Sequence, residues 1–150
     1  MITDPSRLLP AHYKHRIKCA SYLEDVVDPD RLQGTIDYII SNLHGYNYDA
    51  IAFRGLSGML VAPIVALKLH KTILAVRKSD EDNHSGRMVE GDYNARRYVI
   101  IDDIVSSGQT VRDIVELVAK AIPDAECIGV LQYLRWADRG LLSVKSLGIR

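Results

Sequence analysis

The chain has 150 residues, of which 47% are hydrophobic and 25% are charged, and its formal net charge is zero. This length suits one domain, and the apolar content is enough for one core without a disulfide or a metal staple. Because the charges balance, we expect no bulk attraction to nucleic acid or to an anionic membrane. The two cysteines lie in no metal-ligand spacing, and the longest apolar run, residues 59–67, is too short to cross a bilayer. With no secretory signal pattern near the N-terminus, these features predict a cytoplasmic protein.

The predicted elements alternate between helices and strands. Residues 1–28 form an arm with one short strand at 16–20, and apolar residues then recur at helical spacing from Pro29, with Asp28 as N-cap. Gly45 ends that helix. The later pattern predicts strands at 48–53, 72–76, 98–101 and 127–131, and helices at 60–69 and 108–121. Such alternation argues for an α/β fold with a mostly parallel sheet, flanking helices and right-handed crossovers.

Three loops leave the carboxyl ends of predicted strands, at residues 54–58, 78–96 and 102–110. Ligands of parallel α/β sheets bind at these strand ends, so we expect the three loops to converge. The middle loop is polar, charged and long. Long loops in compact domains are usually functional lids or disordered segments, and a lid is the prediction here.

The loop at 102–110 has the chemistry of a ribose 5-phosphate site. Asp102 and Asp103 follow a buried strand, and since like charges repel they suit sugar hydroxyls, a divalent cation or a developing positive charge rather than phosphate. Small residues then lead into a helix N-terminus, whose unpaired N–H groups and partial positive charge favour an anion. The expected ligand-binding residues here are Ile104, Val105, Ser106, Ser107, Gly108, Gln109 and Thr110. An arbitrary pair of aspartates could simply be solvated, but this combination after a buried strand favours a binding site.

Residues 99–110, VIIDDIVSSGQT, resemble the phosphoribosyl pyrophosphate signature of type I phosphoribosyltransferases. Gln109 departs mildly from that family, because many members carry Gly, Ala or Ser there. Residues 52–58, AFRGLSG, look like the family's pyrophosphate loop, which often holds a cis peptide; Arg54–Gly55 is the expected place for it. Residues 76–78, VRK, look like the strand end that opens the family's mobile catalytic loop.

The resemblance covers about residues 48–131 and implies the type I phosphoribosyltransferase fold. We therefore expect residues 1–150 to form a single phosphoribosyltransferase domain with a central, mostly parallel sheet. A small hood would come from residues 1–28 and 133–150. Members of the family are commonly homodimers, so a homodimer is expected here too.

The implied reaction moves ribose 5-phosphate from phosphoribosyl pyrophosphate onto a nucleobase and releases pyrophosphate, which makes the chain a pentosyltransferase of nucleotide biosynthesis or nucleobase salvage. Asp102 and Asp103 would hold the ribose hydroxyls and stabilise an oxocarbenium-like transition state. Mg²⁺ is the expected cofactor, and its contact with the two aspartates would be mostly indirect, through substrate and water.

The resemblance also implies roles in the other two loops. Lys78 and Glu90 are the further catalytic candidates, although Lys78 could be a solvated surface lysine. Because neighbouring side chains of a strand alternate, only one of Arg77 and Lys78 should face the site. Arg54 and Lys78 would bind the charged pyrophosphate, although Arg54 could instead be a surface ion-pair partner. The expected substrate-binding residues of these loops are Arg54, Gly55, Leu56, Ser57, Arg77, His84 and Arg87.

The acceptor base stays open between subfamilies. The run at 86–91, GRMVEG, and the tail at 137–149 look like the orotate enzymes, which are slightly favoured and in which Arg139 or Arg135 would meet the carboxylate of orotate. The pyrophosphate loop and the VRK strand end equally resemble adenine enzymes. For a xanthine–guanine enzyme, Trp136 could stack on the base, but it could also be core packing or a dimer contact.

A second class of protein shares this fold and binds phosphoribosyl pyrophosphate as a regulatory ligand with little or no catalysis. A nucleic-acid-binding regulator should show a basic face or an added winged-helix domain. The chain shows neither, which favours an enzyme with no nucleic-acid or membrane partner.

Overall fold

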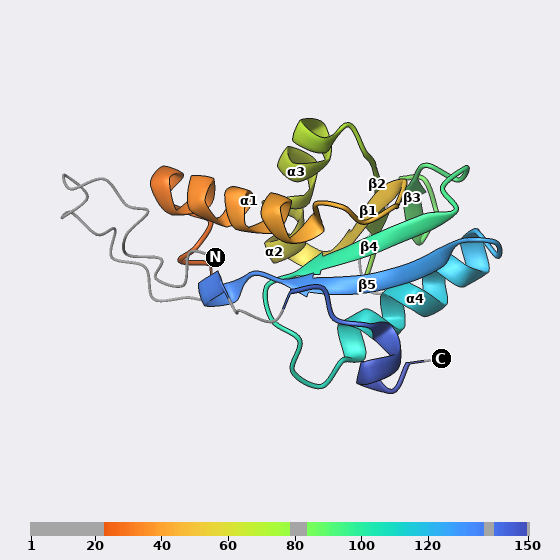
Figure 1. The fold of residues 1–150 in the computed structure, drawn as a ribbon. Helices are drawn as coiled ribbons and strands as arrows, with labels where there is room; N and C mark the ends of the chain where they lie inside the picture. Colours follow the sequence, from red (N-terminus) through yellow and green to blue (C-terminus); the bar gives the residue numbers. More distant parts are fainter. Residues whose placement is uncertain (1–22, 79–83, 137–139, 150) are drawn as a thin grey trace.

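The computed structural model describes residues 23–78, 84–136 and 140–149, and these build a five-stranded sheet in the order β3-β2-β1-β4-β5 (Figure 1). All neighbouring strands pair in parallel except β2 and β3, which are antiparallel. The strands are β1 (Ala50–Arg54), β2 (Thr72–Val76), β3 (Val89–Gly91), β4 (Arg97–Asp102) and β5 (Glu126–Gln132). The predicted α/β class with a mostly parallel sheet is confirmed.

Helices cover both faces of the sheet (Figure 1). One core cluster joins the sheet to α1 and α3, and a second joins its other face to α4 and η3. The helices are α1 (Pro29–Leu43), α2 (Gly55–Met59), α3 (Ala62–Leu69) and α4 (Gln109–Ala121), with 3-10 turns η2 (Leu134–Trp136) and η3 (Val144–Leu147). None of the helices in the described residues is long and apolar enough to span a membrane.

Helix α1 begins where the sequence predicts. The Asp28 carboxylate accepts hydrogen bonds from the N–H groups of Asp30, at 2.9 Å, and Arg31, at 3.1 Å. Pro29 occupies the first turn, where its missing N–H costs nothing. This cap orients α1 so that Ile36, Ile39 and Leu43 are buried against the sheet.

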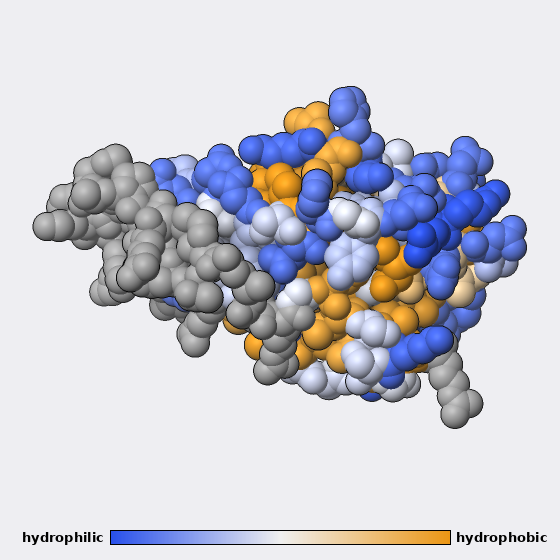
Figure 2. Space-filling model, in the orientation of Figure 1, coloured by the Kyte–Doolittle hydropathy of each residue, from blue (hydrophilic) through white to orange (hydrophobic). Residues whose placement is uncertain are grey.

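The edge strand β5 is partly covered by the chain that follows it. Val130 and Leu142 exchange two backbone hydrogen bonds of 2.8 Å, so the C-terminal segment runs antiparallel along this edge. Figure 2 shows apolar surface over β5 and the C-terminal segment on the same side of the molecule. Covering an edge in this way removes unpaired backbone groups from solvent.

The structure differs from the prediction in three places. The predicted loop at 78–96 contains β3, whose antiparallel pairing with β2 uses only three residues and leaves little periodicity to detect. The predicted turn at 54–58 is largely the short helix α2. Gly108, expected inside a helix, is instead its left-handed N-cap with φ of 78°. The predicted strand at 16–20 and most of the N-terminal hood lie outside the described residues.

Candidate active site at the carboxyl ends of the strands

The loop after β1 and the end of β2 meet at Gly55 and Lys78. A Cβ placed on Gly55 would stand 3.7 Å from Cε and 3.9 Å from Nζ of Lys78. Gly55 has φ of 77°, a conformation that side-chain-bearing residues rarely adopt. The ammonium group of Lys78 therefore lies over the backbone of the loop at residues 54–58, hereafter the pyrophosphate loop.

Asp102 and Asp103 stand at the carboxyl end of β4 in different environments. Asp102 is buried, with 7% of its surface exposed, and its Oδ1 accepts a hydrogen bond of 2.9 Å from the N–H of Asp103. Burial, followed by the neighbouring Asp103, raises the pKa of Asp102 to about 7, and a hydrogen bond from Ser57 of the pyrophosphate loop opposes this in part. Asp103 is only half-buried. One aspartate thus titrates near neutral pH beside a more accessible one.

Gln132, the last residue of β5, and Tyr133, which follows it, contact the loops around the acidic pair. The sequence predictions missed both residues. The buried hydroxyl of Tyr133 donates to the carbonyl of Ser57 at 2.8 Å, and the backbone N–H of Tyr133 donates to the carbonyl of Asp102 at 3.1 Å. The Gln132 side chain accepts from the N–H of Val105 at 3.1 Å. Both residues leave a parallel strand beside β4, so the rule on strand ends would have singled them out.

The loop at residues 104–110, hereafter the phosphate loop, leads directly into α4. Gly108 has no side chain to cap the helix, which leaves the N–H groups of Thr110 and Val111 in the first turn able to donate to an anion. Within the loop, the N–H of Gln109 donates to Oγ of Ser107 at 3.3 Å. Arg112, which the sequence predictions missed, donates to the carbonyl of Ser107 at 3.1 Å and brings a positive charge beside Gly108. Ile104, Ser106, Ser107 and Gln109 are exposed, and Val105 and Thr110 are half-buried.

Arg54 makes an ion pair with Asp113 of α4 instead of standing free. Its side chain is only 12% exposed. The Arg54–Gly55 peptide is trans, as are the other peptides in the described residues, so the expectation of a cis bond there is wrong. The positive φ of Gly55 turns the chain without a cis peptide. Elsewhere in this loop Leu56 is exposed and Ser57 is buried.

Arg77 and Lys78 diverge, as their alternation along the strand predicts. The Arg77 guanidinium donates to the Glu90 carboxylate at 3.2 Å across the β2–β3 pair. Glu90 also accepts from the Ser85 hydroxyl, and these two hydrogen bonds, that of Ser85 first, lower the pKa of Glu90. The guanidinium of Arg87 lies 5.6 Å from the ring centre of Tyr93.

These contacts at the base of the predicted lid tie its return strand to β2. His84 is exposed, and residues 79–83 lie outside the described part of the chain.

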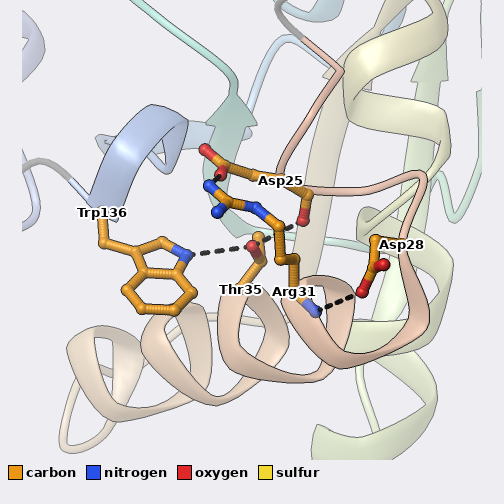
Figure 3. Close-up of polar contacts among 5 residues, drawn as sticks. All are labelled: Asp25, Asp28, Arg31, Thr35 and Trp136. Atoms are coloured by element: carbon orange, nitrogen blue, oxygen red, sulfur yellow. Dashed lines mark hydrogen bonds and ion pairs between the residues drawn. The ribbon is translucent and has the colours of Figure 1, made fainter. Parts of the chain in front are cut away.

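Trp136 packs on α1, as Figure 3 shows. Its Nε1–H donates to Oγ1 of Thr35 at 3.0 Å, and the Thr35 hydroxyl donates to the carbonyl of Asp25 at 2.8 Å. The buried carboxylate of Asp25 in turn pairs with Arg31. Three roles were expected for Trp136: packing in the core, a dimer contact or stacking on a base. The structure shows packing against α1, and stacking on a base stays a prediction. Arg139 lies outside the described residues.

The two aspartates suit a magnesium ion that brings most of its own ligands. No group of three or more His, Cys, Asp or Glu side chains converges within the described residues, so a site supplied wholly by these residues is absent there. Asp102 and Asp103 offer hard oxygen ligands on one strand end, which fits an ion held mainly by substrate and water.

Comparisons with known proteins agree with this geometry. Residues 34–135 match the family model of the phosphoribosyl transferase domain. The chain is 30% identical over 83 residues to an orotate phosphoribosyltransferase from Staphylothermus marinus, an alignment with 55% of this chain and 41% of the relative. It is 24% identical over 136 residues to an adenine phosphoribosyltransferase from Agathobacter rectalis, with 78% and 76% covered. The chain spans less than half the length of the first curated orotate relatives it matches.

Solved structures share the fold. An orotate phosphoribosyltransferase from Mycobacterium tuberculosis superposes with a TM-score of 0.62 at 16% identity, over 87% of this chain and 73% of that one. An adenine phosphoribosyltransferase from Thermoanaerobacter pseudethanolicus gives 0.61 at 22% identity, over 81% and 78%. Since the family model spans more than half of the sequence, this chain belongs to the phosphoribosyl transferase domain family.

Proposed function

We propose that this chain transfers the ribose 5-phosphate of phosphoribosyl pyrophosphate to a ring nitrogen of a nucleobase. The bond from C1 of the ribose to pyrophosphate breaks and pyrophosphate leaves with the electron pair. A bond from the base nitrogen to C1 forms, and the nitrogen loses its proton. The observation that carries the proposal is the acidic pair Asp102 and Asp103, which ends β4, contacts the pyrophosphate loop through Ser57 and is followed along the chain by the N-terminus of α4.

The residues divide the substrate between them in this proposal. The phosphate loop donates backbone N–H groups to the 5-phosphate. Asp103, and Asp102 once it is ionised, accept from the ribose hydroxyls and stabilise the positive charge that develops on the ring. Lys78 neutralises charge on the leaving pyrophosphate. Bound Mg²⁺ would add positive charge to the pyrophosphate, and the aspartates would meet it mostly through substrate and water.

Orotate is the favoured acceptor within this proposal, with adenine or another purine as the competing choice. The curated relatives of this chain include seven named orotate phosphoribosyltransferases and one named adenine phosphoribosyltransferase. Trp136 and Arg139 are the proposed base-side residues.

The proposal includes a homodimer in the cytoplasm without a nucleic-acid partner. Balanced charge supports the last point. Exposed apolar side chains on α2 and α3, namely Leu56, Met59 and Leu67, support self-association. Sedimentation of the purified protein tests the dimer directly, and a single monomeric species at micromolar concentration would contradict it.

The test of activity measures pyrophosphate release from phosphoribosyl pyrophosphate with Mg²⁺ and each common nucleobase in turn. We expect release with orotate, or with adenine or another purine, and loss of release in the double variant Asp102→Asn/Asp103→Asn. Asp124→Asn, at an exposed turn, is the matched control and should keep full activity. Full turnover in the double variant would refute the assigned roles.

A regulatory protein of the same fold is the second candidate. It would bind phosphoribosyl pyrophosphate with Mg²⁺ but release no pyrophosphate with any base. Direct titration of the ligand beside the activity assay separates the two.

A further inference from the structure

One ion pair joins the pyrophosphate loop to α4, the helix that follows the phosphate loop. Arg54 ends β1 and opens the pyrophosphate loop, whereas Asp113 lies on α4 one turn after the phosphate loop, 59 residues along the chain. The Arg54 guanidinium donates through Nη1 to Oδ2 of Asp113. Their side chains are 12% and 32% exposed, so the pair is partly shielded from water.

The other oxygen of the same carboxylate holds the start of α4. Oδ1 of Asp113 accepts a hydrogen bond of 2.7 Å from Nε2 of Gln109, the first residue of the helix and the last but one of the phosphate loop. The hydrogen bond from Gln109, and then that from Arg54, lower the pKa of Asp113, so the carboxylate is charged at neutral pH. Each oxygen therefore engages a different loop.

Arg54 depends on this contact for its orientation. Its Nε is buried and has no hydrogen-bond partner among the described residues. Loss of the Asp113 charge would leave a largely buried guanidinium without its ionic partner, a costly arrangement that the side chain would relieve by moving. Gln109 is also the position where the phosphate signature departs from the usual small residue.

We propose that Asp113 is a positioning residue that clamps Arg54 and Gln109 and thereby sets the spacing between the pyrophosphate loop and the phosphate loop. The inference rests on the proposed function, because phosphoribosyl pyrophosphate carries an anion at each end of one sugar. Two loops at the right spacing bind both ends at once, and the second end then binds intramolecularly. Either fragment alone, ribose 5-phosphate or pyrophosphate, needs only one loop.

The experiment titrates three ligands with Mg²⁺ by calorimetry: phosphoribosyl pyrophosphate, ribose 5-phosphate and pyrophosphate. In Asp113→Asn we expect the dissociation constant of phosphoribosyl pyrophosphate to rise about tenfold, while those of both fragments change less than about twofold. Glu116→Gln is the matched control, because it removes the charge of an exposed ion pair with Lys120 on the same helix. It should bind all three ligands as the wild type does.

A double-mutant cycle with Arg54→Gln separates a clamp from a direct ligand. In a clamp, Arg54→Gln/Asp113→Asn binds phosphoribosyl pyrophosphate no more weakly than the weaker single variant. The inference would be overturned if the double variant raised the dissociation constant of phosphoribosyl pyrophosphate by the product of the two single fold-changes. It would also be overturned if the affinity for pyrophosphate fell as much as that for the whole substrate. Equal binding by Asp113→Asn and Glu116→Gln would do the same.

Gln109→Ala, at an exposed position, keeps the test decisive where Asp113→Asn does not fold. It removes one arm of the clamp and should weaken the whole substrate about threefold with the fragments unchanged. Unchanged binding of phosphoribosyl pyrophosphate would count against the clamp. A wild-type protein that binds no phosphoribosyl pyrophosphate would instead refute the proposed function itself.

Discussion

The indole ring of Trp136 lies directly against Gly34 of α1. A Cβ on Gly34 would stand 2.7 Å from Cζ2 and 2.8 Å from Cη2 of the ring. The same indole donates to Thr35, the next residue of the helix (Figure 3). The close approach of η2 to α1 therefore requires a residue without a side chain at position 34.

Gly34→Ala should lower the free energy of unfolding by about 1–3 kcal/mol, because the added methyl group overlaps the ring. Alanine has a higher helix propensity than glycine, by up to about 1 kcal/mol, and this gain would offset part of the loss in unfolding free energy. Denaturant unfolding measures it, and emission from the single tryptophan reports whether the ring has moved. Gln33→Ala, at the exposed neighbouring position, is the control. A stabilised Gly34→Ala protein with unchanged emission would show that the packing is looser than described.

Asp102 should make the stability of the protein depend on pH. Its pKa in the native state is raised from 3.8 to about 7, so the native state keeps a proton that the unfolded chain has released. The free energy of unfolding should therefore fall as pH rises from about 4 to about 7 and then level off. In Asp102→Asn this fall should disappear. The free energy of unfolding of the variant, taken relative to the wild type, should therefore be higher at pH 8 than at pH 4 by an amount on the order of a few kcal/mol. Parallel unfolding curves of the two proteins at every pH would contradict the assigned pKa.

Two glycines of the β2–β3 region should respond differently to alanine. A Cβ on Gly91 would stand 2.0 Å from the carbonyl oxygen of Ile73, whereas a Cβ on Gly86 meets nothing within 4 Å. Both have positive φ, 145° and 67°, so backbone strain is common to both. Gly91→Ala should cost several kcal/mol of unfolding free energy, and Gly86→Ala about 1 kcal/mol. Equal thermal shifts in the two variants would refute the close contact.

Lys78 should contribute to substrate binding through its place over Gly55. Under the proposed function, Lys78→Gln should raise the KM for phosphoribosyl pyrophosphate about tenfold or more, since a charge-assisted contact to an anion is worth roughly 1.5–3 kcal/mol. Lys68→Gln, an exposed lysine in the last turn of α3, is the matched control. Initial rates at saturating base distinguish them, and an unaltered KM in Lys78→Gln would remove Lys78 from the site.

Local patterns carried much of the prediction. Short apolar runs and helical spacing predict four of the five strands and three of the four α-helices, because periodicity and caps such as Asp28 act within a few residues. Strand β3 was not predicted because three residues are too few to show a period. Helix α2 was not predicted because a single helical turn has the sequence pattern of a loop. The rule that ligands bind at the carboxyl ends of parallel strands predicted that the strand-end loops lie together, and the contacts of Gly55 with Lys78 and of Ser57 with Asp102 agree with it.

The sequence by itself determined the alternating elements and the paired aspartates before a helix N-terminus. Only the tertiary structure decided that Asp102 is buried with a raised pKa, that Arg54 pairs with Asp113, and that Trp136 lies on Gly34. The physical reason is range. Backbone propensity and capping depend on neighbours in the chain, whereas burial, ion pairing and ring packing depend on how elements 59 to about 100 residues apart are placed together.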